Sequence, residues 1–277
     1  MEIHAVPQWQ GALWDGAAAR LPDGCRALAA LAADVLGADV RELPVRPGGS
    51  PTVAGIGNRA ALTTNRDAQL SALESPDGAV LTIGGDCAVD LVPPGVARFR
   101  HGRELTVVWF DAHADCNTAE SSPSGAFHGM VLRSLFGDGD AEFAAGPPLE
   151  RGHAVLLGTR AFDAAERQAV VDGLVRHVPP PADPADVRDT LAATGSGPVY
   201  LHVDLDVLDP ATFGGTYYHE PGGLTVEQLC AALDGVSGHE VVGAAVTECA
   251  TVDASELAAV TPVLEVIGRL LTDSSRC

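Results

Sequence analysis

The chain has 277 residues, of which 46% are hydrophobic and 19% are charged, and its mean hydropathy is +0.14. This composition excludes an intrinsically disordered chain and supplies enough apolar side chains for one large core. The formal net charge of −20 disfavours binding to nucleic acid or to an anionic membrane, and no apolar run approaches the length needed to span a bilayer.

Short apolar strands are predicted to alternate with helices along the chain. In chain order the predicted elements are helix 25–36, helix 58–73, strand 79–83, strand 105–110, strand 154–157, helix 162–175, strand 198–203, helix 225–233, strand 241–246 and helix 255–271. Nearly continuous apolar runs are typical of strands that are buried on both faces. The pattern therefore predicts an α/β fold in which helices cover both sides of a parallel sheet. We expect one domain, residues 1–277, with the proline-rich stretch 177–184 as an internal loop.

The cysteines are scattered along the chain and include no CxxC pair. They are Cys25, Cys87, Cys116, Cys230, Cys249 and Cys277. The first residues also lack the basic and apolar regions of a secretory leader. We therefore expect free thiols and a cytoplasmic location.

Polar residues follow the predicted strands at the point where each strand ends. The strands lead into Gly84-Gly85-Asp86-Cys87, Asp111-Ala112-His113-Ala114-Asp115, Gly158-Thr159-Arg160, Asp204-Leu205-Asp206 and Thr247-Glu248. Ligands of open α/β sheets bind outside the carboxyl ends of the strands. The sequence therefore predicts one convergent site at this edge of the sheet.

Two acidic clusters within this set indicate a metal centre. Asp111, His113 and Asp115 would share one face of an extended segment, as would Asp204 and Asp206. Taken alone, the cluster of Asp111, His113 and Asp115 is equally compatible with a solvated loop. In the second cluster, we assign Asp209, beside Pro210, to capping of the following turn. Four carboxylates and an imidazole exceed the needs of one ion and suit two divalent ions with bridging carboxylates. Mixed oxygen and nitrogen donors favour Mn²⁺, with Zn²⁺ and Fe²⁺ as open alternatives.

The motifs GGDC, DAHAD, HGM, HVDLDVLDP and TE, in this order, resemble the ureohydrolase family of arginase and agmatinase over residues 81–248. The resemblance implies a three-layer α/β/α fold, a binuclear manganese centre and hydrolysis of a guanidinium group. It also implies that Asp111 and Asp204 bridge the two ions. His113 and Asp206 would complete one ion, and Asp115 and the residue at position 87 would complete the other.

Position 87 departs from the family pattern, which has histidine after Gly-Gly-Asp. Cys87 is either a small buried thiol that costs the centre one ligand, or a thiolate ligand. We favour the thiolate, because a divalent ion promotes deprotonation of a neighbouring thiol. A thiolate makes the ligand set more negative, so the ions become weaker Lewis acids.

The resemblance also assigns residues around the metal centre. His128 would protonate the leaving amine, Glu248 would bind the guanidinium, and Asp115 would steer a proton of the nucleophile. Asn117 and Ser124 fall where arginase holds the substrate carboxylate, and Asp163 falls where it contacts the amino group. These three side chains could instead cap loops, and Ala126 and Ala161 replace polar residues of the family. The segment Tyr217-Tyr218-His219 could shape the mouth of the site.

The predicted substrate is an α-amino acid with a guanidine-like head. A weaker Lewis acid disfavours plain arginine and favours Nω-hydroxy-L-arginine, which would give hydroxyurea and L-ornithine. The chain is similar to the family's hydroxyarginine amidinohydrolases, which serve D-cycloserine biosynthesis. Three alternatives stay open: an arginase or agmatinase that releases urea, a deacetylase-like enzyme with one Zn²⁺, and a catalytically impaired binding protein. The chain ends six residues after Leu271 without an extended tail, so we expect a monomer rather than a trimer.

Overall fold

The computed structural model describes residues 1–74 and 78–273. Within these residues the strands form one eight-stranded sheet in the order β2-β1-β3-β8-β7-β4-β5-β6, and every pairing in it is parallel. The strands are β1 Glu2–Val6, β2 Val40–Glu42, β3 Val80–Gly84, β4 Thr106–Phe110, β5 Ala154–Leu157, β6 Arg176–Val178, β7 Val199–Asp204 and β8 Val241–Thr247. The predicted parallel sheet is confirmed.

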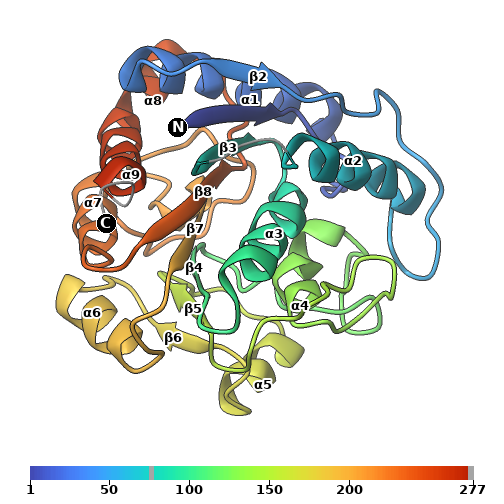
Figure 1. The fold of residues 1–277 in the computed structure, drawn as a ribbon. Coiled ribbons are helices and arrows are strands. Elements are labelled where there is room, and N and C mark those ends of the chain that lie inside the picture. Colours follow the sequence, from blue (N-terminus) through green and yellow to red (C-terminus); the bar gives the residue numbers. More distant parts are fainter. Residues whose placement is uncertain (75–77, 274–277) are drawn as a thin grey trace.

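Helices cover both faces of this sheet, which gives three layers (Figure 1). The α-helices are α1 Ala17–Leu36, α2 Arg59–Ala72, α3 Val92–His101, α4 Val131–Leu135, α5 Ala164–Val171, α6 Pro184–Ala192, α7 Val226–Asp234, α8 Ala254–Ala259 and α9 Thr261–Asp273. Three 3₁₀ turns, η1 Cys87–Leu91, η2 Phe127–Met130 and η3 Leu205–Val207, carry segments of the strand-end motifs. None of the described helices is long and apolar enough to cross a membrane.

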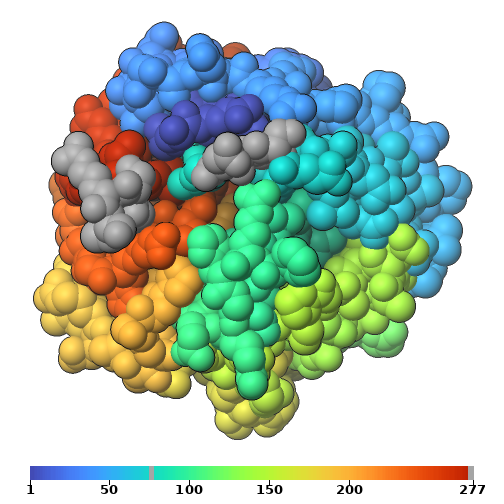
Figure 2. All heavy atoms as spheres, in the orientation of Figure 1, coloured from blue at the N-terminus to red at the C-terminus, as the bar shows by residue number. Residues whose placement is uncertain are grey.

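The core is divided by the sheet into two apolar layers. Alternate strand residues such as Ile83, Phe110 and Leu201 pack with α1, α6, α7 and α9 on one face. Trp109 and Tyr200 point to the other face, where residues of α2, α3, α4 and α5 cover them. Helix α1 packs against α9, and the space-filling view shows blue segments beside red ones (Figure 2).

The structure adds elements that the sequence patterns did not indicate. The strand prediction missed β1, β2 and β6, of which β2 and β6 have three residues each and lie at the edges of the sheet. The helix predictions missed α3, α4 and α6. Helix α3 contains adjacent prolines, which a helix tolerates only in its first turn.

Several predicted boundaries are wrong. The predicted loop 177–184 overlaps the end of β6 and the start of α6, because Pro184 occupies the first turn of that helix. The predicted helix 255–271 is interrupted at Val260 and forms α8 and α9, and the helix predicted to begin at residue 25 begins at Ala17.

Candidate active site

The carboxyl ends of the central strands bring most of the predicted site residues to one cavity. Its volume is about 240 Å³. The predicted site residues that line it are Cys87, His113, Asp115, Asn117, Ser124, His128, Asp163, Asp204, Asp206, Tyr218 and Glu248. Asp111, which is fully buried, is absent from the lining and lies below it.

Potential metal-ligand atoms gather in three overlapping groups, with the atoms of each group within 4.8 Å of one another. The groups are Cys87, Asp111, Asp115 and His202; Cys87, Asp204 and Glu248; and Asp111, His113 and Asp206. Asp111 belongs to a group on each side, as a bridging carboxylate would, whereas Asp204, the other predicted bridge, belongs only to a group with Cys87. The division between a Cys87 side and a His113 side matches the division that the family resemblance implies, while the individual ligand roles stay predictions.

The backbone of the segments that follow the strands directs the potential ligand side chains toward one another. Asp86 accepts hydrogen bonds from the backbone N–H groups of Gly11 and Ala88, which fixes the turn that presents Cys87. Gly85 approaches Gln8 so closely that a Cβ would lie 1.7 Å from the Gln8 oxygen. Asp115 and Glu248 both have positive φ, 50° and 61°, a conformation that costs free energy in non-glycine residues and recurs at functional sites.

The electrostatics of the Cys87 side call for positive charge. The Cys87 Sγ lies 2.9 Å from Asp204 Oδ2. Burial, and after it the Asp204 carboxylate, raises the pKa of the Cys87 thiol well above its usual range. Burial, followed by neighbouring carboxylates, likewise raises the pKa of Asp115 and of Asp204 well above the usual values. Divalent ions would remove this repulsion and hold the sulfur as a thiolate, so the donor set fits them.

The His113 side is more open. His113 Nδ1 lies 3.0 Å from Asp206 Oδ2 and 3.5 Å from Asp111 Oδ1. Burial opposes protonation of His113, but Asp206 and Asp111 raise its pKa above the usual value. Burial also opposes ionisation of Asp206, yet His113 holds the pKa of that carboxyl below its usual range. A metal ion on Nδ1 would replace the proton in this arrangement.

His128 and Glu248 form a hydrogen-bonded pair in the cavity. His128 Nδ1 lies 3.0 Å from Glu248 Oε1, which also accepts from the Cys87 backbone N–H at 3.2 Å. Burial disfavours the His128 imidazolium, but Glu248 raises the pKa of His128 above its usual value. Glu248 Oε2 is buried and has no hydrogen-bond partner among the described residues. That oxygen is therefore available to a substrate donor.

The three predicted amino-acid contacts lie together on the cavity wall. Asn117 Nδ2 donates to Asp163 Oδ2 at 2.9 Å, and Asp163 begins helix α5, where its N–H donates to Glu166 Oε2. Ser124 Oγ accepts from the Ala126 N–H at 3.1 Å. These residues thus make the local contacts of loop-capping side chains and also line the cavity, so the two interpretations are compatible.

The remaining predicted residues fall as follows. Tyr218 lines the cavity, with its ring centroid 5.4 Å from that of His113, whereas Tyr217 stacks on Trp14. His219 contacts the Gly214 carbonyl. Asp209 accepts from the backbone N–H groups of three residues of nearby turns, which confirms its capping role. Five cysteines, 25, 87, 116, 230 and 249, are free thiols, and Cys277 lies outside the described residues.

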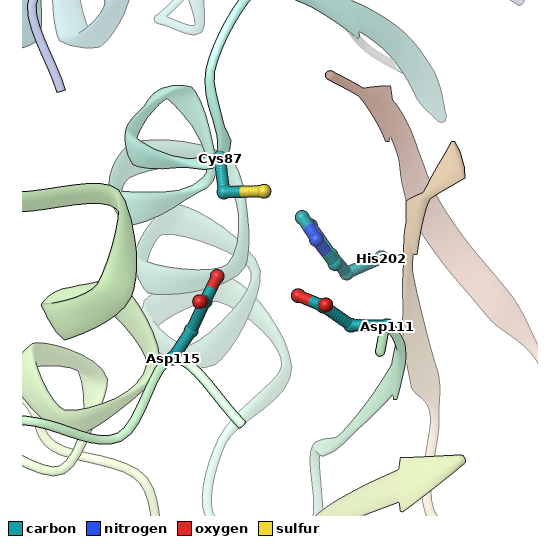
Figure 3. Close-up of side chains that lie close together, drawn as sticks. All are labelled: Cys87, Asp111, Asp115 and His202. Atoms are coloured by element: carbon teal, nitrogen blue, oxygen red, sulfur yellow. The ribbon is translucent and has the colours of Figure 1, made fainter. Parts of the chain in front are cut away.

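One residue near the metal ligands was not singled out from the sequence. His202, on β7, lies in the group with Cys87, Asp111 and Asp115, and Figure 3 shows these four side chains pointing toward one another. A signal for it exists: Tyr200, His202 and Asp204 occupy alternate positions of one strand and therefore share a face. The apolar character of residues 198–203 by itself predicts only a buried strand.

The arginase family profile matches residues 17–268. The chain belongs to the arginase family. This confirms the resemblance drawn from the motifs, and with it the prediction of a hydrolase.

Individual relatives agree with this assignment. An N(omega)-hydroxy-L-arginine amidinohydrolase of Streptomyces lavendulae is 30% identical over 69% of this chain and 67% of its own length. An arginase of Bacillus caldovelox is 31% identical over 60% of this chain, but the match spans only 58% of that arginase. The crystal structure of the Bacillus cereus arginase superimposes with a TM-score of 0.83 at 23% identity and covers 98% of this chain and 97% of the other, which shows the shared fold.

Proposed function

We propose that this chain hydrolyses the guanidine-type C–N bond of a cationic α-amino acid, with Nω-hydroxy-L-arginine as the preferred substrate. Water adds to the guanidine carbon, the bond from that carbon to the side-chain nitrogen breaks, and hydroxyurea and L-ornithine leave. The observation that carries the proposal is the cavity: besides the predicted metal ligands, its lining contains the carboxylates of Asp163, Glu166 and Glu248, and among the described residues no arginine or lysine lines it. Such a cavity favours a cationic substrate.

The chemistry at the guanidine end follows from the pair His128 and Glu248. The partnerless Glu248 Oε2 can accept a hydrogen bond from a guanidine N–H and orient the carbon over the ligand cluster. His128, held by the other oxygen of Glu248, can donate a proton to the departing ornithine nitrogen. Two bound divalent ions, Mn²⁺ in our proposal, supply Lewis acidity and lower the pKa of water.

The amino-acid end of the substrate would reach the opposite wall. Asp163 offers a carboxylate to the α-amino group, while Asn117 and Ser124 offer neutral polar groups to the α-carboxylate. Agmatine has no α-carboxylate and could not form these two contacts. The lining therefore favours an amino acid over its decarboxylated form.

Cys87 supports hydroxyarginine over arginine. A thiolate donates more electron density than an imidazole, so the nucleophile forms less readily and a strongly basic guanidinium reacts slowly. An N-hydroxyguanidine is less basic and offers an oxygen to the metal centre. The similarity to the Streptomyces lavendulae amidinohydrolase supports the same choice. The pathway, the oligomeric state and the cellular location of this chain stay predictions.

A substrate panel tests the proposal. Metal-free protein is reloaded with Mn²⁺, its metal content is measured, and hydroxyarginine, arginine and agmatine are assayed by mass spectrometry of the products. We expect hydroxyurea and ornithine, with kcat/KM for hydroxyarginine ~100-fold above that for arginine, a difference of about 2.7 kcal/mol. Equal or faster release of urea from arginine or agmatine would establish an ordinary ureohydrolase instead. No turnover of any of the three would overturn the proposal.

A further inference from the structure

His202 has an unusual environment for a core histidine. It is 0% exposed, and its ring stacks on Trp109 with centroids 3.4 Å apart and an angle of 7°. Its Nδ1 lies 2.8 Å from Asp90 Oδ2, but its Nε2 has no hydrogen-bond partner among the described residues. Leaving a buried polar atom unpaired costs free energy, so this nitrogen calls for a partner.

The Asp90 carboxylate determines which ring nitrogen is free. An ionised carboxylate only accepts, so His202 Nδ1 carries the proton and Nε2 carries the lone pair. Asp90 is itself fully buried and accepts a second hydrogen bond from the Tyr200 hydroxyl at 2.6 Å. A carboxylate on the far nitrogen is the usual arrangement behind a metal-bound histidine, because it fixes the tautomer and the orientation of the ring.

A ring nitrogen of His202 lies close to other potential ligand atoms. The Cys87 Sγ and carboxylate oxygens of Asp111 and Asp115 lie with a His202 ring nitrogen in one group whose atoms are within 4.8 Å of one another (Figure 3). Of the two nitrogens, Nδ1 is taken by Asp90, which leaves Nε2 for the group. Asp115 Oδ2 is also buried without a partner among the described residues.

The 3₁₀ turn η1 contains both a residue of the ligand group and the residue that holds His202. Cys87 and Asp90 both lie in η1, whose backbone departs from helical geometry at Asp90, and both side chains are buried. One reaches the ligand group and the other holds His202. Trp109 has a similar double role, since its ring stacks on His202 and its Nε1 donates to Asp111 Oδ2 at 3.0 Å.

We propose that His202 is a metal ligand, whose Nε2 joins Cys87, Asp111 and Asp115 on the Cys87 side of the centre. Asp90 and Tyr200 are then positioning residues behind it. This inference rests on the proposed function only in taking the cluster as a divalent-metal centre. Its consequence is a mixed site: sulfur, nitrogen and oxygen donors bind the Cys87-side ion, whereas the His113 side offers one imidazole and carboxylates. The softer donors bind Co²⁺ and Zn²⁺ more tightly than Mn²⁺.

X-ray absorption of the unaltered, fully Mn²⁺-loaded protein tests the assignment without any substitution. We expect two imidazole nitrogens and one sulfur per pair of ions. One imidazole per pair, which His113 alone would supply, overturns the proposal. This measurement does not depend on whether a variant folds or on whether any substrate is turned over.

Variants then separate binding from folding. We expect His202→Ala to lower the affinity for one of two bound ions ~100-fold and Asp90→Asn to lower it ~10-fold, measured by equilibrium dialysis with Mn²⁺. His239→Ala is the matched control, because His239 lies outside the three ligand groups and contacts the Gly197 carbonyl. Circular dichroism of the metal-free proteins checks that each variant is folded.

Cobalt gives a third readout. The unaltered protein should show a thiolate-to-cobalt charge-transfer band whose energy shifts in His202→Ala, because the same ion loses an imidazole. Unchanged affinity for both ions and an unchanged band in a folded His202→Ala protein overturn the proposal. If the unaltered protein binds its ions through two imidazoles but does not hydrolyse hydroxyarginine, only the proposed function is wrong and the ligand assignment stands.

Discussion

The two sides of the ligand cluster differ in how far water reaches them. Cys87, in η1, is 2% exposed, and His202, in β7, is 0% exposed. The His113 side chain is 29% exposed, contacts Tyr218 and lines the same cavity as the predicted substrate residues. The buried side is therefore suited to retaining an ion and setting its electron density, and the open side to meeting the substrate.

The substitution that most directly breaks this comparison is Asp111→Asn, because Asp111 belongs to ligand groups on both sides. Losing the shared charge should release both ions and lower kcat/KM by ~10³-fold or more, since metal activation contributes several kcal/mol. Metal analysis after gel filtration, together with the hydroxyarginine assay, checks this.

Asp209→Asn provides the matched control for that experiment. Asp209 also follows a strand of the sheet, since it comes after β7 and η3, but it lies outside the three ligand groups and accepts hydrogen bonds from turn N–H groups. The control should lower the melting temperature slightly and leave metal content unchanged. Retention of both ions by Asp111→Asn would contradict the bridging role.

Cys87→His changes the buried side alone. Replacing a thiolate by a neutral imidazole makes the ions stronger Lewis acids, so kcat/KM for arginine should rise ~10-fold or more while the preference for hydroxyarginine narrows. Both substrates are assayed at matched metal content. Cys87→Ser, which removes the sulfur without adding an imidazole, should not gain arginine activity. If Cys87→His binds both ions and gains nothing on arginine, the electronic explanation of selectivity is wrong.

Glu248→Gln tests the link between the cluster and the proposed acid–base pair, His128 and Glu248. The variant removes the negative charge that raises the pKa of His128, so that pKa should fall. A general acid must be protonated, and activity is lost as pH rises through its pKa. The basic limb of the kcat/KM profile should therefore move to lower pH, and the maximum should fall ~10²-fold. A basic limb that stays in place would assign it to a group other than His128.

The sequence predicted the ligand candidates that follow strands, on both sides of the centre, but not His202 and its partner Asp90. Asp111, His113, Asp204 and Asp206 occur in compact motifs directly after apolar strands, so their convergence follows from a parallel sheet alone. His202 and Asp90 lie inside a strand and a 3₁₀ turn and look like core residues in the sequence. Their contact depends on the pairing of β7 with β4 and β8 and on the turn after β3, which no local pattern contains.

The strands and helices also divide into elements that the sequence predicts and elements that it does not. The central strands β3, β4, β5, β7 and β8 were predictable because each is an apolar run buried on both faces. The edge strands β2 and β6 are three residues long and have exposed positions, so their pairing is set by neighbouring strands rather than by their own composition. The helix α3 was hidden by its prolines.

The smallest expected effect lies at the open end of the cavity. Asp163→Asn removes a carboxylate that would bind the α-amino group, and a hydrogen bond to a charged group is worth about 1.5–3 kcal/mol. The KM for hydroxyarginine should therefore rise ~10-fold or more with kcat nearly unchanged, because this contact is remote from the reacting carbon and is made equally in the ground and transition states. The Asn117 partner of Asp163 can still donate to the new amide oxygen, so the loop should keep its shape. A fall in kcat at constant KM would place Asp163 in the chemistry of the buried side rather than in recognition.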